Sequence, residues 1–124
     1  MSKKYANFGE FLIAKRSERD VTMRELARQL GVSAPFVSDV EKNRCAPLTT
    51  ERLERVAEIL HLSPEERTQM YDLAGNQRDS IAPDLPVYIK GKDYVSYALR
   101  TARDLEADEA DWLAFVEDLK RRKG

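Results

Sequence analysis

The chain has 124 residues, of which 35% are charged and 42% are hydrophobic, and its net charge is −1. This size supports one domain, or one domain with a small appendage, and the composition argues against a disordered chain. The apolar runs are too short to span a bilayer, and no apolar signal segment follows the basic first residues, so we expect a cytoplasmic protein.

The single cysteine and the single histidine limit the disulfide and metal chemistry that the chain can support. Cys45 is the only cysteine, so no disulfide can form within the chain, in keeping with a reducing compartment. His61 is the only histidine and has no cysteine at metal-binding spacing. We therefore expect no metal, no cofactor and no enzyme activity. No segment alternates polar and apolar residues as a strand does, so the expected fold is all-α.

The first predicted helix runs from about Asn7 to Arg19. Asn7 is a suitable N-cap because its side chain can accept a hydrogen bond from a backbone amide of the first turn. Asp20 stands where a glycine more usually ends the helix. The side chains expected to face the core are those of Phe8, Phe11, Leu12 and the aliphatic stem of Lys15.

The next stretch predicts two short helices separated by a turn at Gly31. Thr22 and Glu25 can form a capping box, in which each side chain accepts from the other residue's backbone amide. Gly31 suits a left-handed helix exit, Ser33 caps the second helix, and Pro35 falls in its first turn. The expected core positions are Leu26, Ala27, Leu30, Val37 and Val40. Such a pair of helices lets the second one enter the major groove of DNA.

A fourth helix is predicted from Glu51 to Leu60, with Thr49 or Thr50 as its N-cap. Its apolar positions recur at helical spacing, which indicates one buried face. That face consists of Leu53, Val56, Ala57 and Leu60.

A fifth helix is predicted from Ser63 to about Ala74. Ser63 and Glu66 have the spacing of a capping box, and Pro64 stands at the first helical position, where its missing N–H costs nothing. Gly75 is expected to end this helix.

The rest of the chain predicts a linker and a helical tail. Residues 76–86 are polar, contain Pro83 and Pro86, and lack a long apolar face, so they mark a boundary. We therefore expect a domain over residues 1–75, a linker over 76–92 and a pair of helices over 93–124.

In this tail, Asp93 is expected to cap a helix through Leu105, and a second helix follows from about Asp108 to Arg122. The pair is too small to form a core by itself, so its apolar face needs a partner. We expect a dimer or partner contact there, with packing on the first domain as the alternative. The residues assigned to this contact are Leu99, Trp112, Phe115, Val116 and Leu119.

The segment from Leu26 to Ser33 reads Leu-Ala-Arg-Gln-Leu-Gly-Val-Ser and is followed by Val37-Ser38, Glu41 and the stretch Asn43 to Pro47. This pattern resembles the helix-turn-helix of the Cro/repressor-type (XRE-like) transcriptional regulators. The resemblance covers about residues 7–75. It implies a five-helix repressor-like DNA-binding domain, to which the C-terminal helices are an extension.

Carried over position by position, the resemblance implies two sets of DNA contacts and one structural ion pair. The residues expected to face bases are Ala34, Pro35, Ser38 and Asp39. Those expected to contact phosphate are Thr22, Met23, Arg24, Ser33, Lys42, Asn43 and Arg44. Arg16 and Glu41 are expected to form the ion pair. Two alternatives stay open: Asp39 can pair with Lys42 or Arg44, and the basic residues can form a solvated face.

The distribution of charge supports this assignment better than the net charge does. Residues 1–44 contain nine Lys and Arg against six Asp and Glu, whereas residues 45–75 contain three against six. Because phosphate binding depends on the local patch, an overall charge of −1 does not exclude a DNA-binding protein.

Together these features predict a sequence-specific regulator of transcription that binds double-stranded DNA. The resemblance favours a repressor that acts as a homodimer on a two-fold symmetric operator. The alternative is a DNA-binding antitoxin, or another partner-neutralising protein, whose C-terminal helices bind a second protein.

Overall fold

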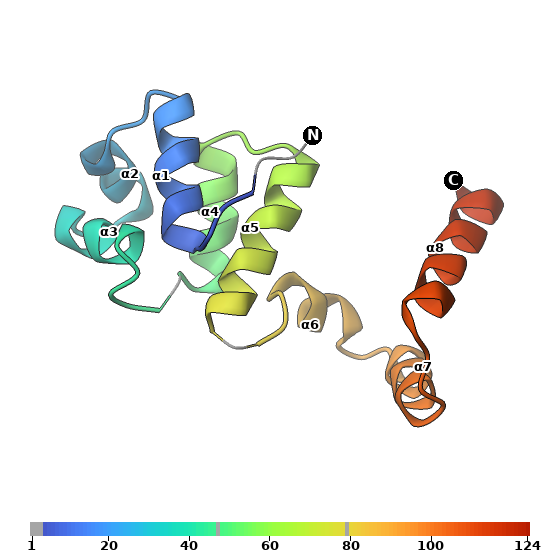
Figure 1. The fold of residues 1–124 in the computed structure, drawn as a ribbon. Coiled ribbons are helices and arrows are strands. Elements are labelled where there is room, and N and C mark those ends of the chain that lie inside the picture. The colour runs from blue at the N-terminus through green and yellow to red at the C-terminus, as the bar shows by residue number, and fades with distance from the viewer. Residues whose placement is uncertain (1–3, 47, 79) are drawn as a thin grey trace. The chain divides into compact units, whose positions relative to one another are not determined.

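The computed structural model describes residues 4–46, 48–78 and 80–124, and these residues form eight α-helices and no strand, which confirms the all-α prediction (Figure 1). The chain divides into two compact units, Met1–Val87 and Tyr88–Gly124. In the first unit lie α1 (Phe8–Glu18), α2 (Met23–Leu30), α3 (Ala34–Glu41), α4 (Thr50–Ile59) and α5 (Pro64–Gln77). A short helix, α6 (Asp84–Ile89), crosses the division, and α7 (Asp93–Asp104) and α8 (Glu109–Lys123) follow it. Pro47, which belongs to the family pattern, and the basic Lys3 lie outside the described residues.

The helix boundaries of the first unit are set by local capping. Each N-cap side chain accepts a hydrogen bond from the backbone amide three residues later, at 2.8–3.3 Å. The N-caps are Asn7, Thr22, Ser33, Thr49 and Ser63. At the ends of α1 and α2, Asp20 and Gly31 adopt left-handed φ angles of 55° and 73°. These caps and exits were all predicted from the sequence.

The first unit encloses a single hydrophobic core. Helix α2 packs against α3 and α4, while α1 packs against α3 and α5. All the predicted inward positions of the first and fourth helices are buried, and Leu30 of α2 is partly buried. The largest fully buried side chains are those of Phe8, Phe11, Leu12, Leu26, Val37, Val40, Leu53, Val56, Leu60 and Met70. Full burial of each such side chain contributes roughly 1.5–3 kcal/mol.

The fifth helix is longer than the sequence predicts. It continues through the buried Gly75 to Gln77, and Arg78 is its C-cap. The chain then turns back, so that the amide of Ser80 donates to the carbonyl of Gly75 at 2.9 Å and Ala82 is buried. Gly75 therefore does not end the helix, because the returning chain packs against it.

The expected linker over 76–92 also contains regular structure, because α6 lies within it. Pro86 stands in the first turn of α6, where a missing N–H is tolerated. Proline is tolerated in the first turn of a helix but breaks a helix interior. Because the sequence does not show which of the two applies to Pro86, it predicted an irregular segment.

The second unit has helices but no interior. Asp93 does not cap α7, since the N-cap is Lys92 and makes no side-chain cap bond, and Asp93 is the first helical residue. Asp108 caps α8, with Asp111 completing a reciprocal capping box. No residue of α7 or α8 is buried. Across the described residues, no helix combines the length and the apolar character needed to cross a bilayer.

A partly buried ion-pair cluster joins α1 to the start of α5. Glu66 accepts from the Ser63 amide at 2.9 Å, and it pairs with Lys15 at 2.9 Å and with Arg19 at 2.8 Å. Burial by itself would raise the pKa of Glu66, but the Ser63 amide and the two cations outweigh it and hold the pKa at about 2. Burial likewise opposes the charged form of Lys15, yet Glu66, Glu18 and Tyr5 raise its pKa.

The depressed pKa of Glu66 predicts an acid-sensitive contribution to stability. The contribution is complete above the ordinary value of 4.5 and is lost as the pH falls towards about 2. We expect Glu66→Gln to lower the free energy of unfolding at pH 7 by on the order of 2–3 kcal/mol, and to flatten its pH dependence below pH 4.5. Urea denaturation at several pH values measures both effects. Glu58→Gln, at an exposed site on α4, is the matched control; equal acid sensitivity of the wild type and Glu66→Gln would contradict the prediction.

Candidate nucleic-acid interface

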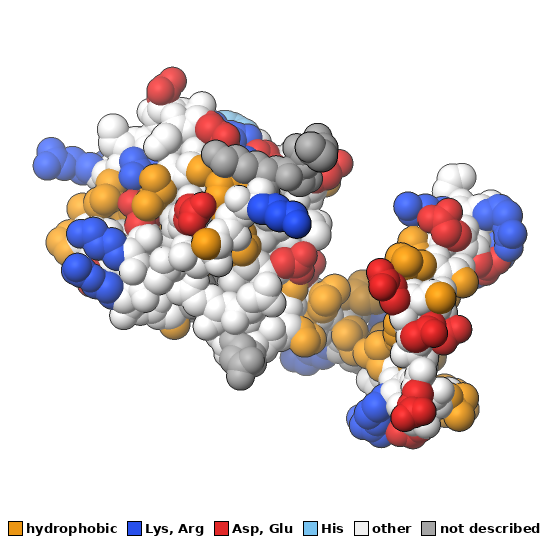
Figure 2. Space-filling view, in the orientation of Figure 1, with side chains coloured by type: hydrophobic (Ala, Val, Ile, Leu, Met, Phe, Trp, Pro, Cys, Tyr) orange, Lys and Arg blue, Asp and Glu red, His pale blue; other side chains and the backbone are white. Residues whose placement is uncertain are grey.

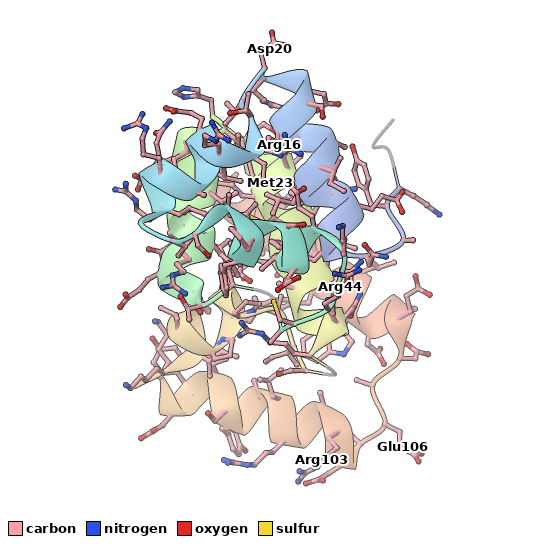
Figure 3. The ribbon with its side chains drawn as sticks, turned by 90° about the vertical axis from the view of Figure 1, so that its left-hand side faces the viewer. Arg16, Asp20, Met23, Arg44, Arg103 and Glu106 are labelled. Carbon is pink, nitrogen blue, oxygen red and sulfur yellow. The ribbon has the colours of Figure 1, made fainter. Side chains whose placement is uncertain are left out.

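Helix α3 has one face in the core and one face outside it. Val37, Val40 and Glu41 are buried, whereas Pro35 is exposed and Asp39 is half-exposed. The predicted base-facing residues therefore share the outer side of α3, although they are not equally accessible. Ala34 and Ser38 are partly covered, and Ala34 packs against the core. Figure 3 looks onto this face, with Met23 labelled near the start of α2 and Arg44 after the end of α3.

The N-terminal ends of α2 and α3 expose hydroxyl groups whose oxygens are already engaged. Thr22 Oγ1 accepts from the Glu25 amide at 3.0 Å, and Ser33 Oγ accepts from the Phe36 amide at 3.2 Å. Each hydroxyl can still donate its own hydrogen to a phosphate oxygen. Met23 packs partly against the core, so its backbone amide and not its side chain is suited to a phosphate.

The capping box predicted at Thr22 forms only in part. The Glu25 carboxylate does not fold back to the Thr22 amide, because it accepts from Arg28 Nε at 3.0 Å and Gln29 Nε2 at 2.9 Å. Arg28 is also the main cause of a lowered pKa for Glu25. The pairing of the carboxylate with the charged Arg28 guanidinium, three residues along the helix, takes the place of the bond to the Thr22 amide.

The turn after α3 has a structural role that the sequence did not reveal. Asn43 adopts a left-handed φ of 58°, as expected, and its side-chain oxygen accepts from the Gly9 amide at 3.1 Å. A Cβ at Gly9 would lie 2.2 Å from the carbonyl oxygen of Glu41. Only glycine allows this close approach of α1 to α3. The assignment of Asn43 to phosphate thus competes with a contact inside the protein.

The ion pair implied by the resemblance is present. Arg16 Nε donates to Glu41 Oε2 at 2.8 Å, and Arg16 Nη2 donates to Glu41 Oε1 at 3.2 Å. A third bond, from Arg16 Nη1 to the Val21 carbonyl, is 3.2 Å long. The two side chains are 16% and 4% exposed. The two charges are paired with each other inside the fold, so neither side chain is placed to bind a nucleic acid.

Asp39 has an exposed partner in the free chain. Its carboxylate lies 3.8 Å from Arg44 Nη1, and the two side chains are 49% and 67% exposed. A pair this long and this accessible to water contributes little to stability. It matches the alternative in which Asp39 pairs with Arg44, and it can open at low cost when either group meets DNA.

Two arginines of α4 contact α2 and α3, and the sequence did not predict these contacts. The Arg52 guanidinium lies 5.5 Å from the centre of the Phe36 ring, and Arg55 Nη2 donates to the Gln29 carbonyl at 3.1 Å. They tie α4 to α3 and to α2. No sequence signal could have identified them, because both sit on the polar side of an amphipathic helix.

Basic side chains surround the outer face of α3. Arg24, Lys42 and Arg44 are exposed, and Figure 2 shows Lys and Arg projecting from the side formed by α2 and α3. Within the described ranges, no group of three His, Cys, Asp or Glu side chains lies close enough to hold a metal ion.

Comparison with known proteins identifies this region. Residues 7–70 match the family model described as a helix-turn-helix domain. The chain is also similar to the ImmF control region 10 kDa protein of Bacillus phage phi105, with 35% identity over 54 residues. That match covers 44% of this chain and 59% of the phage protein. No solved structure matches.

The buried ion pair generates a prediction about stability. Glu41→Gln keeps the side-chain volume but removes the charge, which leaves the Arg16 guanidinium uncompensated in a largely buried site. We expect the free energy of unfolding at pH 7 to fall by about 3–5 kcal/mol, measured by urea denaturation. Glu54→Gln, at an exposed position on α4, should change it by less than about 0.5 kcal/mol. An unchanged free energy for Glu41→Gln would show that the pair is not a structural element.

Proposed function

We propose that this chain, which belongs to the helix-turn-helix domain family, is a sequence-specific, double-stranded DNA-binding regulator of transcription. The observation that carries the proposal is the outer face of α3. It exposes short side chains between exposed cations, while the opposite face is fixed in the core. A helix with these properties fits the width of the major groove.

Specificity would come from few groups on α3. Pro35 and the accessible part of Ala34 have only apolar side-chain atoms, so they can recognise thymine methyl groups. Ser38 can donate to or accept from a base edge. Asp39 can accept from the amino group of cytosine, and its charge disfavours closeness to phosphate, which would weaken binding to other sequences.

Groups around α3 would hold the duplex in register. The Thr22 and Ser33 hydroxyls, the amides of Met23 and Arg24, and the side chains beyond α3 can all bond phosphate oxygens. On DNA, Arg44 would exchange its 3.8 Å contact with Asp39 for a phosphate, which frees Asp39 for a base. The resemblance implies these assignments, and the exposure of Thr22, Ser33 and Arg44 is compatible with them.

We further propose that the protein represses transcription as a homodimer on a two-fold symmetric operator. The similarity to a phage protein named for a control region supports a regulatory role. Two recognition helices in successive major grooves lie about 34 Å apart, so the half-sites should be about 10 base pairs apart, or a multiple of that. A dimer bound in this way would block access to a promoter without any catalytic step.

Selection of bound sequences from random duplex DNA tests the proposal. The expected result is an enriched sequence with two inverted half-sites at this spacing. Enrichment of no sequence would overturn the proposal of specific binding. Enrichment of a single unrepeated site would overturn the symmetric operator while leaving specific binding intact.

Substitutions on the outer face of α3 and just beyond its C-terminal end should have different effects on DNA binding. Lys42→Ala should weaken binding to all duplexes and reduce the slope of log K against log salt by about 0.9, the value for one lost phosphate contact. Asp39→Asn should instead change the preferred base at one position of each half-site. Fluorescence anisotropy over a salt series measures the first effect, and a repeated selection measures the second.

Lys90→Ala is the control, since it removes an exposed lysine from the second unit. It should leave both the salt slope and the base preference unchanged. Equal effects of Lys42→Ala and Lys90→Ala would mean that the cations near α3 contribute only general charge.

A further inference from the structure

Helix α8 carries an apolar stripe that stays exposed in its own unit. The four side chains recur at intervals of three and four residues, so they share one face of the helix. Phe115 is 53% exposed, Trp112 41% and Leu119 37%, and no residue of α8 is buried. The stripe consists of Trp112, Phe115, Val116 and Leu119. Four neighbouring exposed large apolar side chains on one face are typical of an interaction surface.

The charges on α8 are sorted along its length. Asp108, Glu109 and Asp111 lie at its N-terminal end, and Lys120 to Lys123 occupy its last turn. Figure 2 shows Lys and Arg gathered at the C-terminal end of the helix. This order favours the helix itself through its macrodipole. It also makes the helix complementary to a copy of itself that runs in the opposite direction.

We propose that α8 pairs antiparallel with α8 of a second copy of this chain, about a two-fold axis near Phe115 and Val116. Trp112 of each copy then lies opposite Leu119 of the other, and each acidic end meets a basic end. A parallel pair would place acid against acid and base against base. The proposal rests on the proposed function for its purpose, because it specifies how two recognition helices are joined.

The positions of the charges around the helix define the ion pairs between the copies. Glu109 and Lys120 are eleven residues apart, which is about three turns, so they lie on the same side of the stripe. Asp111 and Arg122 have the same separation and lie on the other side. In an antiparallel pair, matching sides face each other. Glu109 therefore meets Lys120 of the second copy, Asp111 meets Arg122, and the symmetry forms each pair twice.

Glu109 and Lys120 are the sharper pair to test. Arg122 Nε already donates to Asp118 at 2.9 Å, and Asp111 is engaged in the capping box. Within the described residues, neither Glu109 nor Lys120 takes part in an ion pair. Because no described side chain of the single chain pairs with either charge, their reversal breaks no ion pair within α8, and its remaining effect on one chain is through the helix macrodipole.

Charge reversal followed by mixing tests the pairing on the full chain. Glu109→Lys and Lys120→Glu should each weaken self-association roughly tenfold in sedimentation equilibrium, since each turns two attractions into two repulsions. An equimolar mixture of the two variants should associate about as well as the wild type, because every pair between unlike chains is again opposite in sign. Circular dichroism monitors the helix content of each variant. Any loss of helix content within one chain persists in the mixture. Recovery of association on mixing therefore reports only on contacts between chains.

Glu117→Lys makes the same charge change on the far side of α8 and should leave association unchanged. A monomeric wild type, a mixture that stays as weak as its components, or an equal effect of Glu117→Lys would each overturn the antiparallel pairing. Binding to a duplex with one half-site separates this result from the proposed function. Wild type and Glu109→Lys should bind it equally, whereas failure of both to bind any duplex would overturn DNA recognition and not the pairing.

Discussion

The attachment of the C-terminal end of α3 to α1 determines what the outer face of α3 can do. Arg16 holds Glu41 in two hydrogen bonds, and the Gly9 amide donates to Asn43 just beyond the helix. The missing side chain at Gly9 lets the two backbones meet. With one end of α3 fixed in this way and Val37 in the core, the outer side chains keep a defined direction, which recognition of base edges requires.

In the first unit, some cations are paired within the fold and others are exposed and can bind phosphate. Lys15 of α1 and its C-cap residue Arg19 are paired with Glu18 and with Glu66 of α5. Arg52 and Arg55 of α4 contact α3 and α2. The cations beside α3 are either without a strong partner or held only loosely, as Arg44 is by Asp39. A nearly neutral chain can therefore present a basic surface, because what matters for phosphate is which charges the fold leaves exposed.

The second unit is stabilised differently from the first, because its helices form without a hydrophobic core. Capping and the macrodipole stabilise α8 locally, through the Asp108 box and the basic last turn. In the single chain the side chains of its apolar stripe remain 37–53% exposed, so much of their surface faces water. An antiparallel partner would bury that stripe and supply the two-fold symmetry that a palindromic operator requires. Recognition and assembly would then reside in separate parts of one short chain.

The sequence by itself determined every helix except α6, most of the helix caps and the core of the first unit. These features depend on residues within one or two turns of each other, such as Asn7 with Glu10 or Ser63 with Glu66. Capping chemistry and helical periodicity are readable at that range. The left-handed positions of Asp20, Gly31 and Asn43 could be predicted for the same reason.

Only the tertiary structure decided which polar groups form hydrogen bonds or ion pairs inside the fold. The bonds from Gly9 to Asn43 and from Arg19 to Glu66 span 34 and 47 residues, so they depend on how α1 docks against α3 and α5. Packing also decides that α5 continues through Gly75, which the returning chain at Ile81 and Ala82 approaches closely, and that Ala34 is partly covered by the core. A linear pattern specifies which side of a helix is apolar, but the neighbour that meets its polar side follows from three-dimensional packing.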